Sequence, residues 1–234
     1  MFNAPIAHRG LWDMESPENS IGAFLNAIDY GYSIELDVSF TKDLVPVIFH
    51  DKSLLRLTGV DKNIADCYFC CIKKLTLINS NQKIPTLAQV LDIVSDSVPL
   101  YIEIKNYNFF GYKDKVDKLM ELLKDYDGRY VIKSFDYRII KYIYKKYNST
   151  SIIQIVSLDN FRRKLIFYPI WFLARKKVSQ FSVSYEYFKK KKIFSLFANS
   201  DFLLWTIKDI DEYNKCKKIT KNVVFENFKP EKDK

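Results

Sequence analysis

Residues 33–50 read SIELDVSFTKDLVPVIFH and hold two apolar, β-rich runs in close succession. The second run, 45–50, follows the first after only TKDLV. A connection this short cannot make a parallel crossover, which needs about a dozen residues or more. The second run therefore folds back on the first as a β-hairpin, and it is set aside when parallel strands are counted.

Over the rest of the chain, short apolar runs alternate with longer amphipathic ones, which is typical of β-α units around a parallel sheet. Helical patterns lie between most of these strands, at 20–30, 86–95, 113–125, 136–147 and 208–218. The expected parallel strands lie near 5–8, 33–39, 100–105, 129–134, 151–157, 180–185, 202–207 and 222–226. Eight such strands predict an α/β fold, a closed (β/α)₈ TIM barrel with a β-hairpin after the second strand. The stretch 51–85 is then a short insertion beside the site.

Length and charge give broader expectations. We expect one domain over residues 1–234, because α/β barrels reach this length. A net charge of +9 favours anionic partners. Since no nucleic-acid-binding motif is recognisable, nucleic acid is not an expected partner. The N-terminus shows no secretory signal pattern, so a cytoplasmic protein is expected. The sequence does not indicate an oligomeric state.

Two other features have simple interpretations. The four cysteines, Cys67, Cys70, Cys71 and Cys216, have no second Cys/His pair that would complete a zinc site, and we expect buried or free thiols. The segment 161–178 has an apolar centre interrupted by a proline and flanked by basic clusters. It is too short to span a bilayer. It predicts either a kinked helix that covers the barrel or an interfacial element in weak contact with an anionic membrane.

Acidic side chains alternate with aliphatic ones on two of the expected strands. In SIELDVSF, Glu35 and Asp37 share one face and the aliphatic residues share the other. YIEIK repeats the pattern, with Glu103 and Lys105 on one face. In a barrel, the apolar face packs beneath the helices, and the polar face lies near the C-terminal mouth, where barrel active sites form.

Three converging carboxylates would repel one another and raise each other's pKa values unless a cation neutralises them. All-oxygen ligation suits Mg²⁺ or Ca²⁺ better than zinc. This pattern predicts a divalent metal bound by Glu35, Asp37 and Glu103. The alternative is an ion-pair network of the same acids with Arg9 and Lys105, without metal.

The chain has two histidines, His8 and His50, and each follows an apolar run. Imidazoles exchange protons near neutral pH, so two of them beside a phosphodiester can act as general acid and general base. Arg9 offers a bidentate phosphate contact and Lys105 a point charge. The group has the parts needed for phosphodiester chemistry.

The chain resembles the glycerophosphodiester phosphodiesterase family, a TIM-barrel family similar to phosphatidylinositol-specific phospholipase C. The resemblance rests on motifs that occur in the family's order: AHRG (7–10), SPENS (16–20), IELDVSFTKDLVPVIFHD (34–51), LLRLTG (54–59), IPTLAQVL (84–91), YIEIK (101–105), KSFD (133–136) and WTIKD (205–209). The resemblance implies three groups of site residues: the metal ligands Glu35, Asp37 and Glu103, the acid-base pair His8 and His50, and the substrate contacts Arg9, Lys105 and Trp205.

The implied reaction is metal-dependent hydrolysis of a small glycerophosphodiester to an alcohol and sn-glycerol 3-phosphate. Alternative substrates are a lysophospholipid or a surface polymer that bears phosphoglycerol, and a non-enzymatic alternative is a phosphate-binding barrel. The family's hairpin turn usually reads T-x-D-G, whereas Leu44 stands in the place of its glycine, so a slightly different turn is expected. Asp51 and Arg56 fit the family pattern, and we interpret both as supporting residues.

Overall fold

The structure is a computed structural model that describes residues 2, 4–107, 111–147, 150–156, 180–189 and 201–231. The chain forms two compact units, one of Ala7–Tyr130 and one of Met1–Ile6 with Val131–Lys234. We call them the N-terminal unit and the C-terminal unit. The segment 161–178 lies outside the described residues, so both interpretations of it stay predictions.

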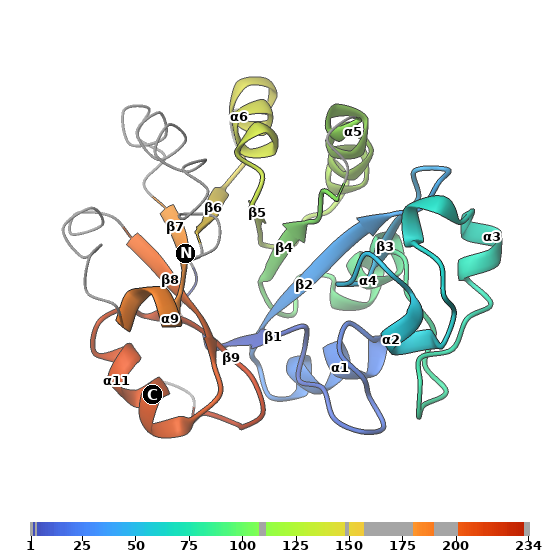
Figure 1. The fold of residues 1–234 in the computed structure, drawn as a ribbon. Coiled ribbons are helices and arrows are strands. Elements are labelled where there is room, and N and C mark those ends of the chain that lie inside the picture. Colours follow the sequence, from blue (N-terminus) through green and yellow to red (C-terminus); the bar gives the residue numbers. More distant parts are fainter. Residues whose placement is uncertain are drawn as a thin grey trace. The chain divides into compact units, whose positions relative to one another are not determined.

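The N-terminal unit alternates strands and helices (Figure 1). In chain order its elements are β1 (Ile6–His8), α1 (Ile21–Asp29), β2 (Ser33–Phe40), β3 (Pro46–Ile48), α2 (Leu55–Thr58), the 3₁₀ helix η1 (Ile64–Asp66), α3 (Phe69–Ile72), α4 (Leu87–Val94), β4 (Leu100–Ile104) and α5 (Tyr112–Leu123). β2 pairs in parallel with β4 and antiparallel with β3. The antiparallel pairing confirms the predicted hairpin.

The central strand of this unit, β2, is buried along its whole length. Its aliphatic residues Ile34, Leu36 and Val38 are fully buried. They share one face of the strand, and its acidic residues share the other. The alternation in SIELDVSF therefore fixes which residues pack in the core and which remain for the site.

The entry to α1 explains two small residues of the early motifs. Ser20 caps the helix, since its Oγ accepts a hydrogen bond from the backbone amide of Ala23. Gly10 has φ +81°, and a Cβ at this position would lie 2.8 Å from the carbonyl oxygen of Ala23. A side chain at residue 10 would thus prevent the loop after β1 from packing against α1.

The predicted insertion, 51–85, has its own small hydrophobic core. Apolar side chains from the hairpin and from the insertion pack together, and they are Val47, Phe49, Leu54, Ile64, Cys67, Ile72, Leu77 and Ile84. The short helices α2 and α3 and the 3₁₀ helix η1 lie in this stretch. Because the hairpin shares this core, the insertion supports the segment that carries His50.

The C-terminal unit continues the alternation of strands and helices. Its described elements are β5 (Tyr130–Ser134), α6 (Tyr137–Lys146), β6 (Ile152–Val156), β7 (Gln180–Ser184), α9 (Tyr185–Lys189), β8 (Asp201–Ile207), α11 (Ile210–Lys217) and β9 (Asn222–Phe225). Strands β5 to β9 pair in parallel, each with the next. Helices α6 and α11 begin at the N-cap residues Asp136 and Asp209. Their carboxylates accept hydrogen bonds from backbone amides of the first helical turn.

All the predicted strands are present in the described residues, and β3 is the one antiparallel addition. This order of strands and helices is that of a (β/α)₈ barrel with a hairpin after its second strand. Among the cysteines, Cys67 and Cys216 are buried and Cys70 and Cys71 are exposed, and all four are free thiols. Within the described residues, every helix is too short or too polar to cross a bilayer.

Candidate active site

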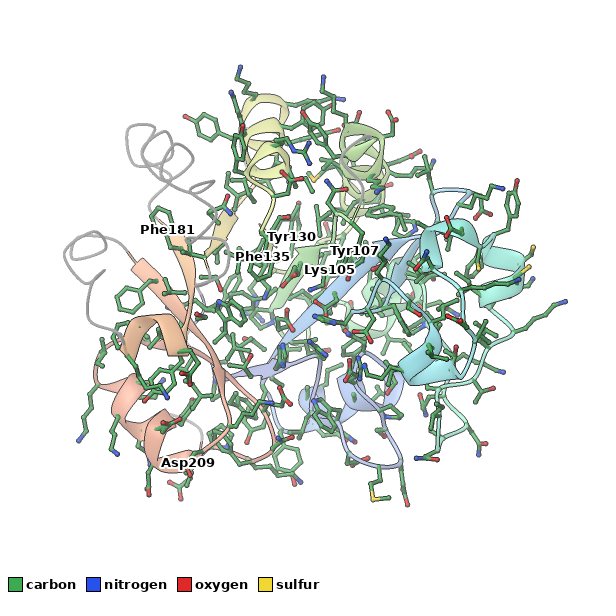
Figure 2. The ribbon with its side chains drawn as sticks, in the orientation of Figure 1. Lys105, Tyr107, Tyr130, Phe135, Phe181 and Asp209 are labelled. Carbon is green, nitrogen blue, oxygen red and sulfur yellow. The ribbon has the colours of Figure 1, made fainter. Side chains whose placement is uncertain are left out.

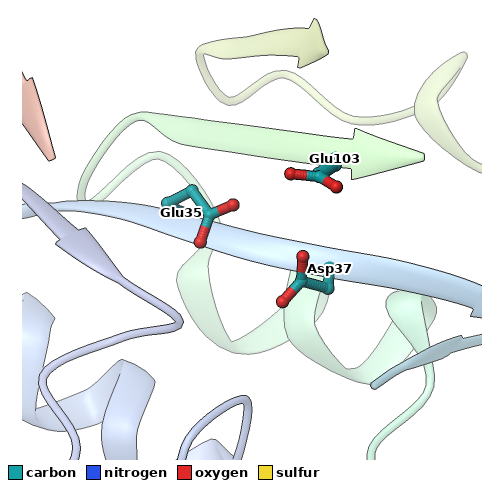
Figure 3. Close-up of side chains that lie close together, drawn as sticks. All are labelled: Glu35, Asp37 and Glu103. Carbon is teal, nitrogen blue, oxygen red and sulfur yellow. The ribbon is translucent and has the colours of Figure 1, made fainter. Parts of the chain in front are cut away.

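Three carboxylates from two neighbouring strands come together in the N-terminal unit. Glu35 and Asp37 lie on β2, and Glu103 lies on β4 directly beside Asp37 in the parallel register. One carboxylate oxygen from each residue lies within 4.8 Å of the other two, and all three side chains are buried. Figure 3 shows the three carboxylates close together on the neighbouring strands β2 and β4. We call these three residues the acidic cluster.

Lys105, at the end of β4, places its ammonium group against the acidic cluster. Its Nζ lies 2.9 Å from Asp37 Oδ1 and donates a hydrogen bond to Glu103 Oε1. Figure 2 shows Lys105 and Tyr107 side by side in the segment that follows β4. Burial alone would lower the pKa of Lys105, but the attraction of Asp37 and Glu103 outweighs it and raises the pKa above its usual range. Lys105 therefore stays charged at neutral pH.

Asp37 contacts two cationic side chains, Lys105 and Arg9. Burial would raise the pKa of its carboxyl group, but the attraction of Lys105 and Arg9 holds the pKa well below its usual range. Arg9 Nε lies 3.3 Å from Asp37 Oδ2. Asp37 therefore stays ionised, as a metal ligand must.

The end of β1 turns sharply at Arg9, which has a left-handed backbone with φ 60°. This conformation is costly for a residue with a side chain, and such strain often lies at functional sites. It aims the Arg9 amide at the acidic cluster, where it donates to Glu35 Oε2 over 3.0 Å. The neighbouring His8 places its Nε2 3.9 Å from the same oxygen. The HR pair thus presents an imidazole, an amide and a guanidinium to the site.

His50, the second histidine, follows β3. The residue before it, Phe49, donates its backbone amide to the carbonyl oxygen of Asp37 over 2.9 Å, which places His50 beside the cluster. The Nδ1 atom of His50 lies 2.7 Å from Asp51 Oδ1. Tyr107, after β4, donates its hydroxyl to the backbone carbonyl of His50. Both the ring and the backbone of His50 are thus fixed.

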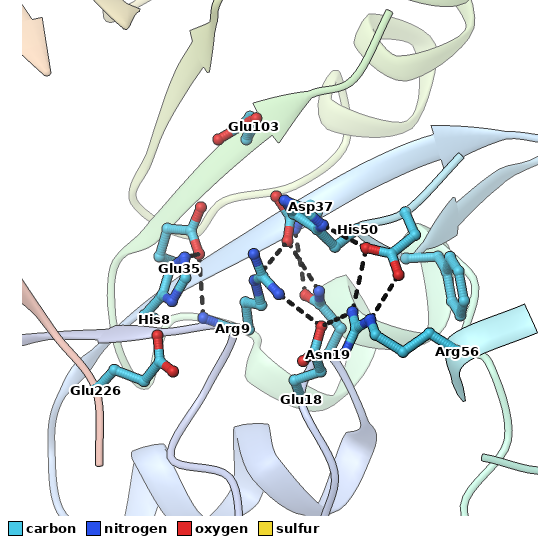
Figure 4. A network of polar contacts seen from close by, with 12 residues as sticks. His8, Arg9, Glu18, Asn19, Glu35, Asp37, His50, Arg56, Glu103 and Glu226 are labelled. Carbon is cyan, nitrogen blue, oxygen red and sulfur yellow. Dashed lines mark hydrogen bonds and ion pairs between the residues drawn. The ribbon is translucent and has the colours of Figure 1, made fainter. Parts of the chain in front are cut away.

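Two residues of SPENS belong to the site, although their sequence pattern predicts no role for them. Asn19 is 1% exposed and hydrogen-bonded to Asp37, and Glu18 accepts a bond from Arg9 Nη1 over 2.7 Å. Figure 4 shows both residues in a continuous polar network with Asp37. The only sequence signal for them is the position of SPENS among the ordered motifs, because a loop has no periodicity from which side-chain direction can be read.

The acidic cluster fits a hard divalent cation. Oxygen ligands of Mg²⁺ or Ca²⁺ lie about 2.0–2.6 Å from the ion, so two of them are at most roughly 5 Å apart. The 4.8 Å limit within the cluster agrees with this range. Two cationic side chains, Arg9 and Lys105, face three buried carboxylates, so a further positive charge would complete the charge balance. The ion pairs of the metal-free alternative are also present. They set two positive charges against the three negative charges of the acidic cluster, so one negative charge remains in excess.

Trp205 lies apart from these residues in the chain, on β8 of the C-terminal unit. Its ring packs edge-on against Phe135, with ring centroids 5.7 Å apart and an interplanar angle of 85°. Both residues belong to the C-terminal unit. Its contact with substrate therefore stays a prediction.

Comparison with known proteins supports the assignment to a family. Residues 8–228 match the model of the glycerophosphoryl diester phosphodiesterase family. A glycerophosphodiester phosphodiesterase of Caldanaerobacter subterraneus is 35% identical over 151 residues, which are 60% of this chain and 61% of that protein. A human lysophospholipase D is 28% identical over 222 residues, which are 86% of this chain and 67% of that protein. The chain thus spans about two thirds or less of the length of these relatives.

A solved structure shares the fold. A phosphodiesterase of Oleispira antarctica, in complex with the product sn-glycerol-3-phosphate, has a TM-score of 0.80 and 23% sequence identity, and the match covers 95% of this chain and 92% of that one. This likeness confirms the predicted (β/α)₈ barrel. The family model matches nearly the whole chain, including both histidines and the acidic cluster. The chain therefore belongs to the glycerophosphoryl diester phosphodiesterase family.

Proposed function

We propose that this protein hydrolyses a glycerophosphodiester to an alcohol and sn-glycerol 3-phosphate, acting as a single domain. The observation that carries the proposal is the meeting of three buried carboxylates with His8, Arg9 and Lys105 in one unit of a chain of this family. The bound product named for the Oleispira antarctica phosphodiesterase supports the choice of product.

Cationic side chains would bind the phosphate group of the substrate. Arg9 and Lys105 both contact the acidic cluster, so each is held where a phosphate oxygen could approach the carboxylates. Trp205 is proposed as a further substrate contact. A divalent ion bound by Glu35, Asp37 and Glu103, Mg²⁺ or Ca²⁺, would supply Lewis-acid stabilisation of the phosphoryl oxygens. The residues themselves orient the phosphate and balance its charge.

The two histidines would move the protons. Nε2 of His50 takes the proton of the attacking hydroxyl group, the bond from phosphorus to the alcohol oxygen breaks, and His8 gives that oxygen a proton. In the route that the family resemblance implies, the attacking group is the glycerol 2-hydroxyl of the substrate, and water then opens the cyclic phosphate. An internal nucleophile gains several kcal/mol from proximity, on the order of effective-molarity effects.

The decisive experiment is a substrate panel with the purified full chain. Glycerophosphodiesters with small head groups are incubated with Mg²⁺, with Ca²⁺ or with excess EDTA, and sn-glycerol 3-phosphate is followed by ³¹P NMR. We expect product from at least one diester, only when the divalent ion is present, and none from the Asp37→Asn variant. Glu121→Gln, at an exposed glutamate paired with Lys118, is the matched control and should keep full activity. Binding of glycerol 3-phosphate without turnover would instead favour the phosphate-binding barrel.

A lysophospholipid is a second candidate substrate, favoured by the name of the human relative. The same panel tests it when lysophosphatidylcholine is included. Release of choline with formation of lysophosphatidic acid would assign the activity to lipid substrates. A phosphoglycerol-bearing polymer is tested in the same panel. Vesicle binding tests the proposed weak membrane contact of 161–178, which should fade as salt rises.

A further inference from the structure

Arg56, in α2, joins two carboxylates that lie outside the acidic cluster. Its Nε and Nη2 donate to Asp51 Oδ2 and Oδ1 over 2.6 and 3.1 Å. Its Nη1 and Nη2 donate to Glu18 Oε2 and Oε1 over 2.9 and 2.8 Å. Both pairs are bidentate, the geometry in which an arginine holds a carboxylate most firmly. Figure 4 shows Arg56 beside Glu18, with dashed lines for the bonds between them.

One end of this network contacts His50. Asp51 Oδ1 lies 2.7 Å from Nδ1 of the imidazole. An ionised carboxylate only accepts hydrogen bonds, so Nδ1 must carry the proton that is shared with it. In a neutral imidazole, Nε2 then keeps a free lone pair. Asp51 thus selects the tautomer in which Nε2 can act as a base.

The other end of the network is anchored in the site. Glu18 accepts the bond from Arg9 Nη1, and Arg9 contacts Asp37. Only 12% of the Glu18 side chain is exposed, so this end has little freedom. Arg56 therefore connects the imidazole to residues that the strands β1 and β2 already hold in place.

Arg56 also keeps Asp51 in its charged form. Burial would raise the pKa of Asp51, but hydrogen bonds from Arg56 and His50 outweigh it and lower the pKa. The Arg56 side chain is 47% exposed, and exposed ion pairs stabilise a fold by only about 0–1 kcal/mol. Asp51 and Arg56 are both partly exposed, so global stability is a poor explanation for the two hydrogen bonds between them, and control of His50 is a better one.

We infer that Arg56 is a positioning residue for His50: it fixes the Asp51 carboxylate against Nδ1, so that the imidazole is protonated there and presents Nε2 to the substrate. The role of His50 in turnover rests on the proposed function. The tautomer does not, because it can be measured in the protein without substrate. Failure of the inference and failure of the proposed function are therefore distinguishable.

The test uses ¹⁵N-histidine NMR of the full chain. With two histidines in the sequence, the spectrum contains two imidazoles, and His8→Gln assigns them. In the wild type we expect the Nδ1–H tautomer for His50. In Arg56→Ala the shifts of the two ring nitrogens should move towards each other as the tautomers mix. Arg56→Lys should keep only part of the preference for the Nδ1–H tautomer. Lysine keeps the positive charge, but an ammonium group cannot bind both carboxylates in a bidentate manner.

A control and a second variant keep the test decisive. Arg129→Ala removes another exposed arginine–aspartate pair, with Asp96, and should leave the His50 shifts unchanged. Asp51→Asn can turn an amide nitrogen towards Nδ1, which requires the Nε2–H tautomer, so it should reverse the preference. This variant keeps Arg56 and serves if Arg56→Ala does not fold.

The kinetic expectation is a loss in kcat rather than in KM. Outer partners that orient a functional histidine are typically worth about 10–100-fold, and we expect a kcat loss of this order in Arg56→Ala with little change in KM. Arg56→Lys should recover part of the loss, and Arg129→Ala should match the wild type. A folded Arg56→Ala protein in which His50 keeps the Nδ1–H tautomer would overturn the inference, whatever its activity.

Discussion

Asn19 holds Asp37 through both ends of its amide. Its Nδ2 donates to Asp37 Oδ2 over 2.9 Å, and its Oδ1 accepts the backbone amide of Asp37 over 3.2 Å. Asn19 has φ 59°, a left-handed conformation that asparagine tolerates better than most residues. The turn that precedes α1 thus fixes the orientation of the Asp37 carboxylate on β2.

Replacing Asn19 separates its amide from its backbone conformation. Asn19→Gly and Asn19→Ala both remove the amide, so both should leave the Asp37 carboxylate oriented by Arg9 and Lys105 alone and should lower activity alike. Asn19→Ala also places a Cβ in the left-handed region, at a cost of roughly 1 kcal/mol relative to glycine. Denaturant unfolding and turnover assays measure the two effects. Equal stability of the two variants would show that the left-handed backbone at residue 19 does not lower the free energy of unfolding. Normal activity in both variants would contradict a role for the Asn19 amide.

Glu18 should make stability depend on acid pH. Burial would raise its pKa, but the bonds and charges of Arg56 and Arg9 outweigh it and lower the pKa. Since the folded-state pKa lies below the unfolded value, near 4.3, the ionised form stabilises the fold above about pH 4.3. This contribution is lost as the pH falls through the folded-state pKa.

The measurement is the difference in unfolding free energy between the wild type and Glu18→Gln at several pH values. The wild type should be more stable at neutral pH, and the difference should shrink below about pH 4.3. Glu15→Gln, at an exposed glutamate of the same loop, should change stability little at any pH. A difference for Glu18→Gln that does not vary with pH would contradict this account.

The parts of the site that lie on strands could be predicted, because a strand has a period of two. The alternation in SIELDVSF and YIEIK determined which side chains share a face, and the structure places Glu35, Asp37 and Glu103 together. Residues in loops could not be predicted this way. The directions of Glu18 and Asn19 depend on a left-handed turn that sequence periodicity does not reveal.

The hairpin turn gives another example. Because Leu44 replaces the usual glycine, the sequence predicts a slightly different turn. In the structure Leu44 adopts the left-handed conformation, with φ 58°, and its amide donates to the carbonyl oxygen of Thr41 over 3.0 Å. The hydrogen bonds of the turn therefore set this conformation, and a leucine in it carries the strain that a glycine would not.

Leu44→Gly should relieve that strain. Relative to Leu44→Ala, which also removes the side chain but keeps the Cβ, the glycine variant should be more stable by about 0.5–1 kcal/mol. This estimate takes roughly 1–2 kcal/mol for a left-handed residue and subtracts about 0.5–1 kcal/mol for the greater freedom of glycine when unfolded. Thermal unfolding measures the difference, and activity should not change in either variant. An alanine variant as stable as the glycine variant would argue against strain at residue 44.

Divalent ion binding should depend on the acidic cluster. Calorimetry with Mg²⁺ or Ca²⁺ should detect binding to the wild type and a large loss in Glu35→Gln, Asp37→Asn and Glu103→Gln, because each removes one charged oxygen ligand. Glu121→Gln lies outside the cluster and should bind as the wild type does. Full turnover in excess EDTA, or unchanged ion affinity in all three variants, would leave the ion-pair network with Arg9 and Lys105 as the better description.

The two histidines should be separable by leaving group. Alanine at His8 or His50 should leave the fold nearly intact and cost about 10²–10⁴ in rate, the usual worth of a positioned acid or base. The double variant should lose less than the product of the single losses, since groups that act as one unit are not additive.

The contacts of His50 with Asp51 favour it as the base, which leaves His8 as the acid. A nitrophenyl ester of glycerol phosphate has a leaving group that needs little protonation, so it should restore turnover in the variant that lacks the acid far more than in the one that lacks the base. Rescue of His50→Ala instead of His8→Ala would exchange the two roles. Wild-type turnover in either single variant would remove that histidine from the mechanism, because a general acid or base that can be deleted without cost transfers no proton in the rate-limiting step.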